Sequence, residues 1–232
     1  CFVLILQLIK NCRENTKIMT SKYYYILMAD IIESRSKEGS ELMEGFKYMV
    51  EEARVQYRPK FISPLTIPLG DEFQSIVQSL QDGIDMIFKI EEYRIRKKYN
   101  FELRYVINYG KIDTPINTEI AHEMLGEGLT EAREALKNLK SQNQNYMVLL
   151  KDKKLENYLN KLFFIYHSII SHWSRKDYEI AGYFMQFKDY KKVAELAGRD
   201  VSSAWRKQKT LRMKEYLTIK NLIQSMAYES FE

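Results

Sequence analysis

The hydrophobic positions of this chain change period along its length, and each period predicts an element. YYYILMAD (23–30) is an apolar run that ends in an acid, as a buried strand does. After Ser40, apolar residues recur at three- and four-residue spacing, which predicts a helix with Ser40 as its cap. The face that this helix would bury contains Leu42, Phe46, Met49, Val50 and Ala53.

A β-hairpin is expected next. FISPLTIPL (61–69) and EFQSIV (72–77) are apolar runs around a short turn, with Asp71 and Glu72 at the tip. Two prolines in the first run indicate a strand that lies at a sheet edge or carries a bulge.

Four further elements complete this half of the chain: a helix starting at Asp82, a strand over 101–110, a helix over 126–140 and a strand over 144–150. Alternation in the strand over 101–110 puts Leu103, Tyr105 and Ile107 on one face and Arg104, Val106 and Asn108 on the other. The order β-α-β-β-α-β, then α-β, predicts an α+β protein. Its fold would be ferredoxin-like (βαββαβ) with one addition, and its helices would cover one face of the sheet.

The rest of the chain has helical periodicity. A stripe at alternating spacings of four and three contains Leu155, Leu159, Leu162, Tyr166 and Ile169. Further helices are expected over 175–186, capped by Ser174, and over 190–198 and 200–217. We therefore predict an α+β domain over 19–152 and an all-α domain over 155–232.

The composition is that of a folded protein, with 45% hydrophobic and 29% charged residues. The cysteines are Cys1 and Cys12, which excludes a disulfide framework or a cysteine metal site in the body and favours the cytoplasm. Residues 1–18 are expected to be a non-native or disordered extension, with Met19 as the true start. The apolar run of about nine residues within this segment is too short to span a bilayer. The alternative to an extension is a short membrane anchor.

Charge is distributed unevenly around the formal net charge of +5. Residues 19–150 contain 17 basic and 20 acidic residues, whereas residues 174–220 contain 12 basic and 6 acidic residues. An acidic body with a basic C-terminal part suggests two separate tasks, the second directed at nucleic acid.

Two acids should converge at one sheet edge. Asp30 ends the first strand and Asp71 lies at the hairpin tip. In a βαββαβ sheet the first and third strands pair centrally, so the two aspartates should be close neighbours. Close carboxylates repel unless a proton or cation intervenes, so the pair could hold Mg²⁺. The alternative is that each aspartate hydrogen-bonds only to nearby backbone.

ADII (29–32) and LGDEF (69–73) resemble the metal motifs of class III nucleotide cyclases and of the related GGDEF and palm-type polymerase domains. LRYVINYGKI (103–112) and GEGLTEAREAL (126–136) are similar to two further cyclase segments. The resemblance implies a Mg²⁺ ion on a nucleoside triphosphate. The metal ligands that it implies are Asp30, Asp71 and the backbone carbonyl of Ile31, and the nucleotide-binding residues are Gly70, Glu72 and Thr130.

The chain departs from the cyclase pattern in one helix. Cyclases have an asparagine there and an arginine four residues later, but this chain has Thr130 and Glu134. Arg133 is one position out, about 100° around a helix, and is the candidate catalytic residue. Two hypotheses stay open: a nucleotide-binding domain without turnover, and a Mg²⁺-dependent nucleotidyl cyclase or nucleotidyltransferase.

The chain also resembles the SatD family over nearly its whole length from Met19. The resemblance lies in MADII (28–32), LGDEFQ (69–74) and the G-x-G-x-x-x-A-R start of the 126–140 helix. It implies a C-terminal helix-turn-helix.

KKVAELAGRDVSSAWRKQK (191–209) fits a helix-turn-helix. A first helix would pack through Val193, Ala194 and Ala197, Gly198 would make the turn, Asp200 would cap the second helix, and Val201 and Ala204 would face inward. The expected DNA-binding residues are Arg199, Ser202, Ser203, Trp205, Arg206 and Lys209. The alternative is a small helical subdomain with a solvated basic face and Trp205 in its core.

Together these features predict a cytoplasmic transcription regulator that binds a nucleotide and DNA and acts without a membrane. Operators usually match a protein two-fold, so we expect a homodimer. Competing hypotheses are the enzyme above and an adaptor whose C-terminal tail binds protein. His122, His167 and His172 are interpreted as structural or surface residues, because a spacing of five does not share a helix face.

Overall fold

A computed structural model of the protein describes residues 22–32 and 39–229, so the predicted extension over 1–18 lies outside the described residues. The N-terminal half is built on a five-stranded sheet in the order β2-β3-β1-β4-β5. Its strands are β1 (Lys22–Ile31), β2 (Phe61–Leu69), β3 (Glu72–Val77), β4 (Leu103–Ile112) and β5 (Tyr146–Leu149). β1 is antiparallel to β3 and β4, β2 is antiparallel to β3, and β5 is parallel to β4. These pairings bring the end of β1 next to the β2–β3 turn.

The prediction for the two-proline strand is confirmed. β2 lies at one edge of the sheet, and its pairing with β3 shifts register between Phe61 and Ser63, again before Thr66, and again before Leu69. Proline has no N–H to donate to a ladder, so an edge strand with irregular pairing accommodates it.

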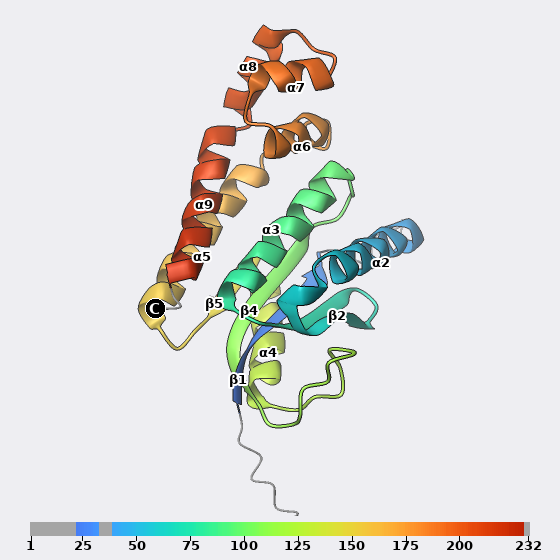
Figure 1. Cartoon of the computed structure of the whole chain (residues 1–232), viewed down its shortest axis with the longest axis vertical. Helices are drawn as coiled ribbons and strands as arrows, with labels where there is room; N and C mark the ends of the chain where they lie inside the picture. The colour runs from blue at the N-terminus through green and yellow to red at the C-terminus, as the bar shows by residue number, and fades with distance from the viewer. Residues whose placement is uncertain (1–21, 33–38, 230–232) are drawn as a thin grey trace, which may run out of the picture.

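Helices cover both faces of the sheet, whereas the sequence predicted one (Figure 1). The helices of this half are α2 (Gly39–Gln56), the short η1 (Arg58–Lys60), α3 (Leu80–Arg96) and α4 (Glu127–Gln142). Leu27 and Ala29 of β1 face a core shared with α2, α3 and α5 (Lys153–Ile170), while Ile26 and Met28 face a second core under α4. The continuous apolar run of β1 therefore reflects burial on both sides.

The C-terminal half is helical, as predicted. After α5 it contains α6 (Tyr178–Gln186), α7 (Tyr190–Leu196), α8 (Val201–Thr210) and α9 (Met213–Glu229). α5 and α9 pack side by side along the sheet half, and α6, α7 and α8 gather at the far end of the molecule (Figure 1). Of the helices within 22–32 and 39–229, none has the length and apolarity to cross a bilayer.

Several predicted boundaries are wrong by a few residues. α3 begins at Leu80, two residues before the predicted start at Asp82, because Ser79 caps it: the Ser79 hydroxyl accepts from the Asp82 N–H at 3.0 Å. The predicted cap Ser40 lies inside α2, and α6 begins at Tyr178, three residues after its predicted start at Arg175. The predicted helix over 200–217 is two helices, since the chain breaks at Arg212, whose φ is +52°.

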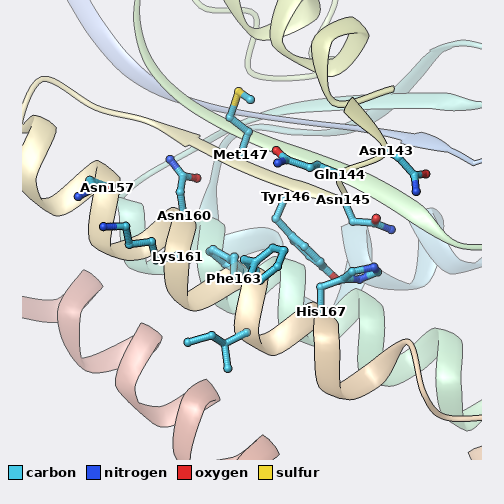
Figure 2. A pocket seen from close by; sticks show the side chains of 12 residues that line it. Asn143, Gln144, Asn145, Tyr146, Met147, Asn157, Asn160, Lys161, Phe163 and His167 are labelled. Atoms are coloured by element: carbon cyan, nitrogen blue, oxygen red, sulfur yellow. The ribbon is translucent and has the colours of Figure 1, made fainter. Parts of the chain in front are cut away.

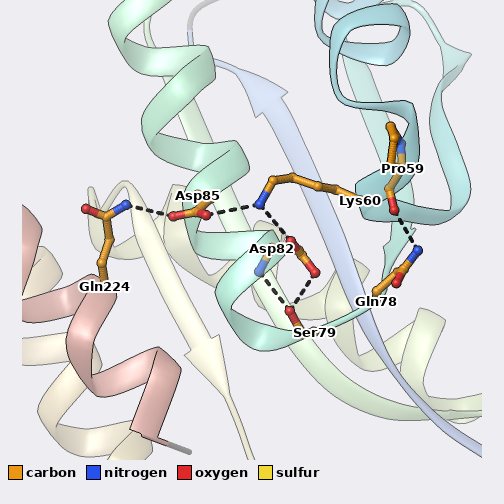
Figure 3. A network of polar contacts seen from close by, with 7 residues as sticks. All are labelled: Pro59, Lys60, Gln78, Ser79, Asp82, Asp85 and Gln224. Carbon is orange, nitrogen blue, oxygen red and sulfur yellow. Dashed lines mark hydrogen bonds and ion pairs between the residues drawn. The ribbon is translucent and has the colours of Figure 1, made fainter. Parts of the chain in front are cut away.

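A polar network joins the two halves at the start of α3 (Figure 3). Lys60 Nζ lies 2.7 Å from Asp82 and 3.1 Å from Asp85, and Asp85 also accepts from the Gln224 amide of α9 at 2.7 Å. About two turns of α3 further on, Glu92 accepts from the Tyr216 hydroxyl at 3.1 Å. α9 is thus attached to α3 by hydrogen bonds as well as by apolar packing.

Candidate functional site

The predicted acidic site lies where β1 ends, on the face of the sheet that α4 covers. Asp30 is directly opposite Glu72 of β3 on one side and Arg104 of β4 on the other. Residues opposite each other in neighbouring strands project to the same face, so these three side chains form one cluster.

Arg104 holds both carboxylate oxygens of Asp30. Its Nε donates to Oδ1 at 2.8 Å and its Nη2 to Oδ2 at 3.0 Å, a two-point contact between a nearly buried guanidinium and a partly buried carboxylate. Burial raises the pKa of Asp30, and the hydrogen bonds and charge of Arg104 oppose that rise. The negative charge of Asp71 adds to the rise.

Asp71 meets the end of β1 through the backbone. The Ile31 N–H donates to the Asp71 carbonyl at 3.0 Å, which fixes the hairpin turn beside Asp30. Gly70, at φ +43°, supplies the left-handed conformation of this turn. The residues predicted as metal ligands, Asp30, Ile31 and Asp71, therefore lie together.

Arg133 reaches the cluster from α4. Its Nε lies 3.6 Å from Glu72 Oε1, and its Nη2 lies 3.5 Å from the Gln74 amide oxygen. Burial raises the pKa of Glu72, and the charge of Arg133 opposes that rise. Glu72 Oε1 is buried and accepts no hydrogen bond from the described residues. Thr130 is exposed in the first turn of α4, away from these contacts.

The residues present do not match a preformed divalent cation site. Asp30 already has Arg104 as its counter-charge at both oxygens. Within the described parts of the chain, no three carboxylate, histidine or cysteine side chains are grouped to hold a metal ion. Mg²⁺ binding by Asp30 and Asp71 stays a prediction, and it would require Arg104 to release Asp30.

Sequence reasoning missed Arg104 and Gln74 as members of the site. A usable signal existed for Arg104, because the alternation in the predicted 101–110 strand puts it on the polar side with Asn108. Placing that strand beside β1 would have paired Arg104 with Asp30. Gln74 follows Glu72 by two residues, so it has the same facing.

The two arginines should control different carboxylates. We expect Arg104→Gln to raise the pKa of Asp30, because the two hydrogen bonds that favour its charged form are lost. Arg133→Gln should instead raise the pKa of Glu72. Side-chain ¹³C NMR titration of both variants measures each shift. If either variant moves both carboxylates equally, the acids titrate as one coupled group and the assignment of partners is wrong.

The predicted DNA-binding residues lie on and beside α8. Asp200 caps this helix as predicted, accepting from the Ser203 N–H at 2.7 Å, and Gly198 makes the preceding turn at φ +59°. Ser202 donates its hydroxyl to Asp200 at 2.6 Å, so it belongs to the cap. Ala204 is buried as expected, but Val201 is 48% exposed because it stands in the first turn beyond the packed face.

The outer face of α8 is basic and aromatic. Trp205 is 43% exposed, which rules out the core position, and Lys209 Nζ lies 3.8 Å from its ring centroid. Arg206 and Arg199 are also exposed. Lys207 points the other way and pairs with Asp177 ahead of α6, which attaches α8 to the rest of the helical half.

Comparisons with known proteins assign the chain to a family. Two structures of a bacterial light-regulated adenylyl cyclase show 12% identity and TM-scores of 0.41 and 0.40, each covering 63% of this chain. The chain spans about half (54%) of the length of those proteins. No curated protein matches. The sequence model of the SatD family matches residues 24–227, so the chain belongs to the SatD family.

Proposed function

We propose that this SatD-family protein is a cytoplasmic regulator that binds DNA through its C-terminal helices and a nucleotide through its sheet domain. In this proposal α7 and α8 form a helix-turn-helix, α8 enters the major groove, and the sheet domain is a ferredoxin-like, nucleotide-cyclase-like unit. The observation that carries the proposal is the outer face of α8, where Trp205, Arg206 and Lys209 are exposed while Ala204 and Lys207 hold the helix in place.

The geometry of α7 and α8 supports this reading. The Arg199 N–H donates to the Ala194 carbonyl at 2.9 Å, which closes α7 into a tight turn at Gly198 before Asp200 starts α8. Val193 and Ala194 are buried, so α7 packs inward, as the first helix of a helix-turn-helix does. A homodimer would present two copies of α8 to a two-fold DNA site.

Salt dependence tests DNA binding. Full-length protein should bind a fluorescent random-sequence duplex with an affinity that falls steeply as salt rises, because lysine and arginine displace counterions from phosphates. In Arg206→Ala/Lys209→Ala the slope of log affinity against log salt should decrease by roughly two, since each lost phosphate contact contributes about 0.9. Fluorescence anisotropy at several salt concentrations measures the slope.

A matched control is Lys47→Ala/Lys89→Ala, which removes two exposed charges from α2 and α3. This variant should keep the wild-type slope. Equal slopes in both double variants would mean that α8 is not the contact surface, and an absence of salt-dependent binding would favour the adaptor hypothesis.

The proposal of nucleotide binding by the sheet domain rests on Arg133 and on the turn at Gly70 and Asp71. Arg133 is half exposed, and its contacts to Glu72 and Gln74 are long, at 3.6 and 3.5 Å, so it can turn toward a phosphate. The alternative, a Mg²⁺-dependent nucleotidyl cyclase or nucleotidyltransferase, draws on the closeness of Asp30 and Asp71. It differs from the regulator in releasing pyrophosphate, and it requires Asp30 to exchange Arg104 for the metal.

A further inference from the structure

A pocket of about 610 Å³ lies on the far side of the sheet from the acidic cluster, between the α4–β5 turn, the edge of β5 and helix α5. Figure 2 shows Asn143, Gln144 and Asn145 along one wall and Asn157, Asn160 and Lys161 along the other. This volume suits a small organic ligand. None of the residues assigned above to metal, nucleotide or DNA lines it.

The pocket is nearly neutral. Its lining includes five side-chain amides and no carboxylate. Lys161, on the rim, is its one lysine or arginine. His167 lies at the inner end, where burial lowers its pKa against the opposing charges of Glu102 and Glu91, with Arg94 adding to the decrease, so its ring is uncharged at neutral pH. A cation finds no counter-charge here, and a phosphate finds only one lysine.

The backbone of Tyr146 offers a donor and an acceptor on the pocket side. The Tyr105 N–H bonds to the Asn145 carbonyl at 2.8 Å, and Tyr105 pairs in register with Tyr146. In a parallel ladder the residue in register turns its own N–H and C=O away from the partner strand. Tyr146 therefore presents both groups at the outer edge of β5, where it lines the pocket.

The next outward position on this edge is closed. Val148 donates its N–H to the Asn160 side-chain oxygen at 2.8 Å and accepts from the Asn160 amide at 2.9 Å. An added peptide strand would need several outward positions in a row, and Asn160 blocks the second one. At this edge, the backbone N–H and C=O of Tyr146 therefore remain available to a ligand, beside the apolar side chains of the pocket.

Phe164 supplies an aromatic face. Its side chain is 69% exposed at the pocket, next to Phe163, which is fully buried and stacked on Tyr146 at 5.1 Å between ring centroids. A flat ring can lie against Phe164 while its edge meets the Tyr146 backbone and the surrounding amides. Amides carry both donors and acceptors, as the edge of a heterocyclic base does.

We propose that this pocket binds a nucleobase or an equally uncharged, planar heteroaromatic ring, which stacks on Phe164 and hydrogen-bonds to the Tyr146 backbone. Neutral lining, a single backbone donor and acceptor pair, and an exposed aromatic ring all match that ligand class. The site is separate from the acidic cluster under α4.

The test uses ¹⁵N-labelled full-length protein, Mg²⁺-free buffer, and adenosine, guanosine, cytidine and uridine as probes, with inorganic phosphate as the anion probe. At least one nucleoside should give saturable shifts of the Tyr146 backbone amide and of the Asn145 and Asn157 side-chain amides. Phe164→Ala should weaken the apparent Kd about tenfold. Tyr158→Ala, which removes another exposed aromatic ring of α5 outside the pocket, should leave the Kd unchanged.

Three results would overturn the proposal. The first is that no nucleoside shifts these amides up to its solubility limit. The second is that phosphate alone reproduces the shifts, or that they appear at Asp30 and Glu72 instead. The third is that Phe164→Ala and Tyr158→Ala bind alike while both keep the wild-type spectrum elsewhere. None of these results bears on DNA binding by α8, so the two proposals fail separately.

Discussion

Replacing Arg94 by methionine should destabilise the protein by about 3–5 kcal/mol, the cost of leaving a buried carboxylate without its partner. Arg94 and Glu91 lie one turn apart on α3, with side chains only 5% and 2% exposed and 2.9 Å between Nη2 and Oε2. Glu91 also accepts from the Tyr105 hydroxyl at 2.9 Å. In Arg94→Met the buried carboxylate of Glu91 keeps the hydrogen bond from Tyr105 but loses its positively charged partner. Urea denaturation measures the loss.

Arg94 contributes more than its charge. It donates to the Phe101 carbonyl at 2.9 Å and to the Tyr178 hydroxyl at 3.3 Å, so it ties the end of α3 to the start of β4 and to α6. Loss of the Tyr178 contact should loosen the junction between the sheet half and the helical half. We expect earlier hydrogen exchange in α6 than in α4 of the variant.

The chain contains a matched control for this prediction. Glu51 and Arg54 of α2 have the same spacing and lie 3.2 Å apart, but their side chains are 57% and 42% exposed. Arg54→Met should cost about 1 kcal/mol or less, because an exposed pair is screened by water. The double variant Glu91→Gln/Arg94→Met should recover much of the loss, since glutamine still accepts from Tyr105 without a charge. Equal costs for Arg94→Met and Arg54→Met would contradict the prediction.

The comparison of these two pairs shows what the sequence alone could provide. Glu91–Arg94 and Glu51–Arg54 have the same spacing in sequence, and it is packing against distant parts of the chain, such as Tyr105 of β4 and Tyr178 of α6, that buries the first pair. The strands, by contrast, were predictable because each carries its own apolar run between turn residues. The meeting of Asp30 and Asp71 followed from strand order alone.

Features that depend on long-range packing could not be predicted from the sequence. The sequence at the break between α8 and α9, at Arg212, contains no glycine or proline that would predict it. In the structure, the Trp173 indole N–H stabilises this break by donating to the Leu211 carbonyl at 2.9 Å. The clamp of Arg104 on Asp30 needed the neighbour of β1 to be known. The pocket beside β5 needed the path of α5, which the helical stripe of the sequence does not specify.

Gly128 sets the distance between α4 and the sheet, and Gly128→Ala should destabilise the protein by roughly the upper end of the 1–3 kcal/mol that overpacking costs. A Cβ at Gly128 would lie 2.5 Å from the carbonyl carbon of Gly110 in β4, and one at Gly110 would lie 2.4 Å from the Gly128 Cα. Both neighbours are backbone atoms, so no side chain can rotate away. Thermal unfolding of the variant measures the cost.

Gly39→Ala is the matched control, since it also adds a methyl group near the start of a helix. Within 4 Å, that methyl would meet no atom of the described residues, and alanine favours helix over glycine by up to about 1 kcal/mol. Gly39→Ala should therefore be neutral or stabilising. A Gly128→Ala protein as stable as wild type would show that α4 can shift at little cost.

The consequence of Gly128→Ala should extend to the acidic cluster. The Asn108 amide donates to the Gly128 carbonyl at 2.8 Å, so α4 is held at this point by a hydrogen bond as well as by close contact. Arg133 lies less than two turns further along the same helix and reaches Glu72 only at 3.6 Å. Moving α4 outward lengthens that contact, so the pKa of Glu72 should rise in Gly128→Ala and stay unchanged in Gly39→Ala. Without that rise, the close approach of the two glycines would serve packing alone.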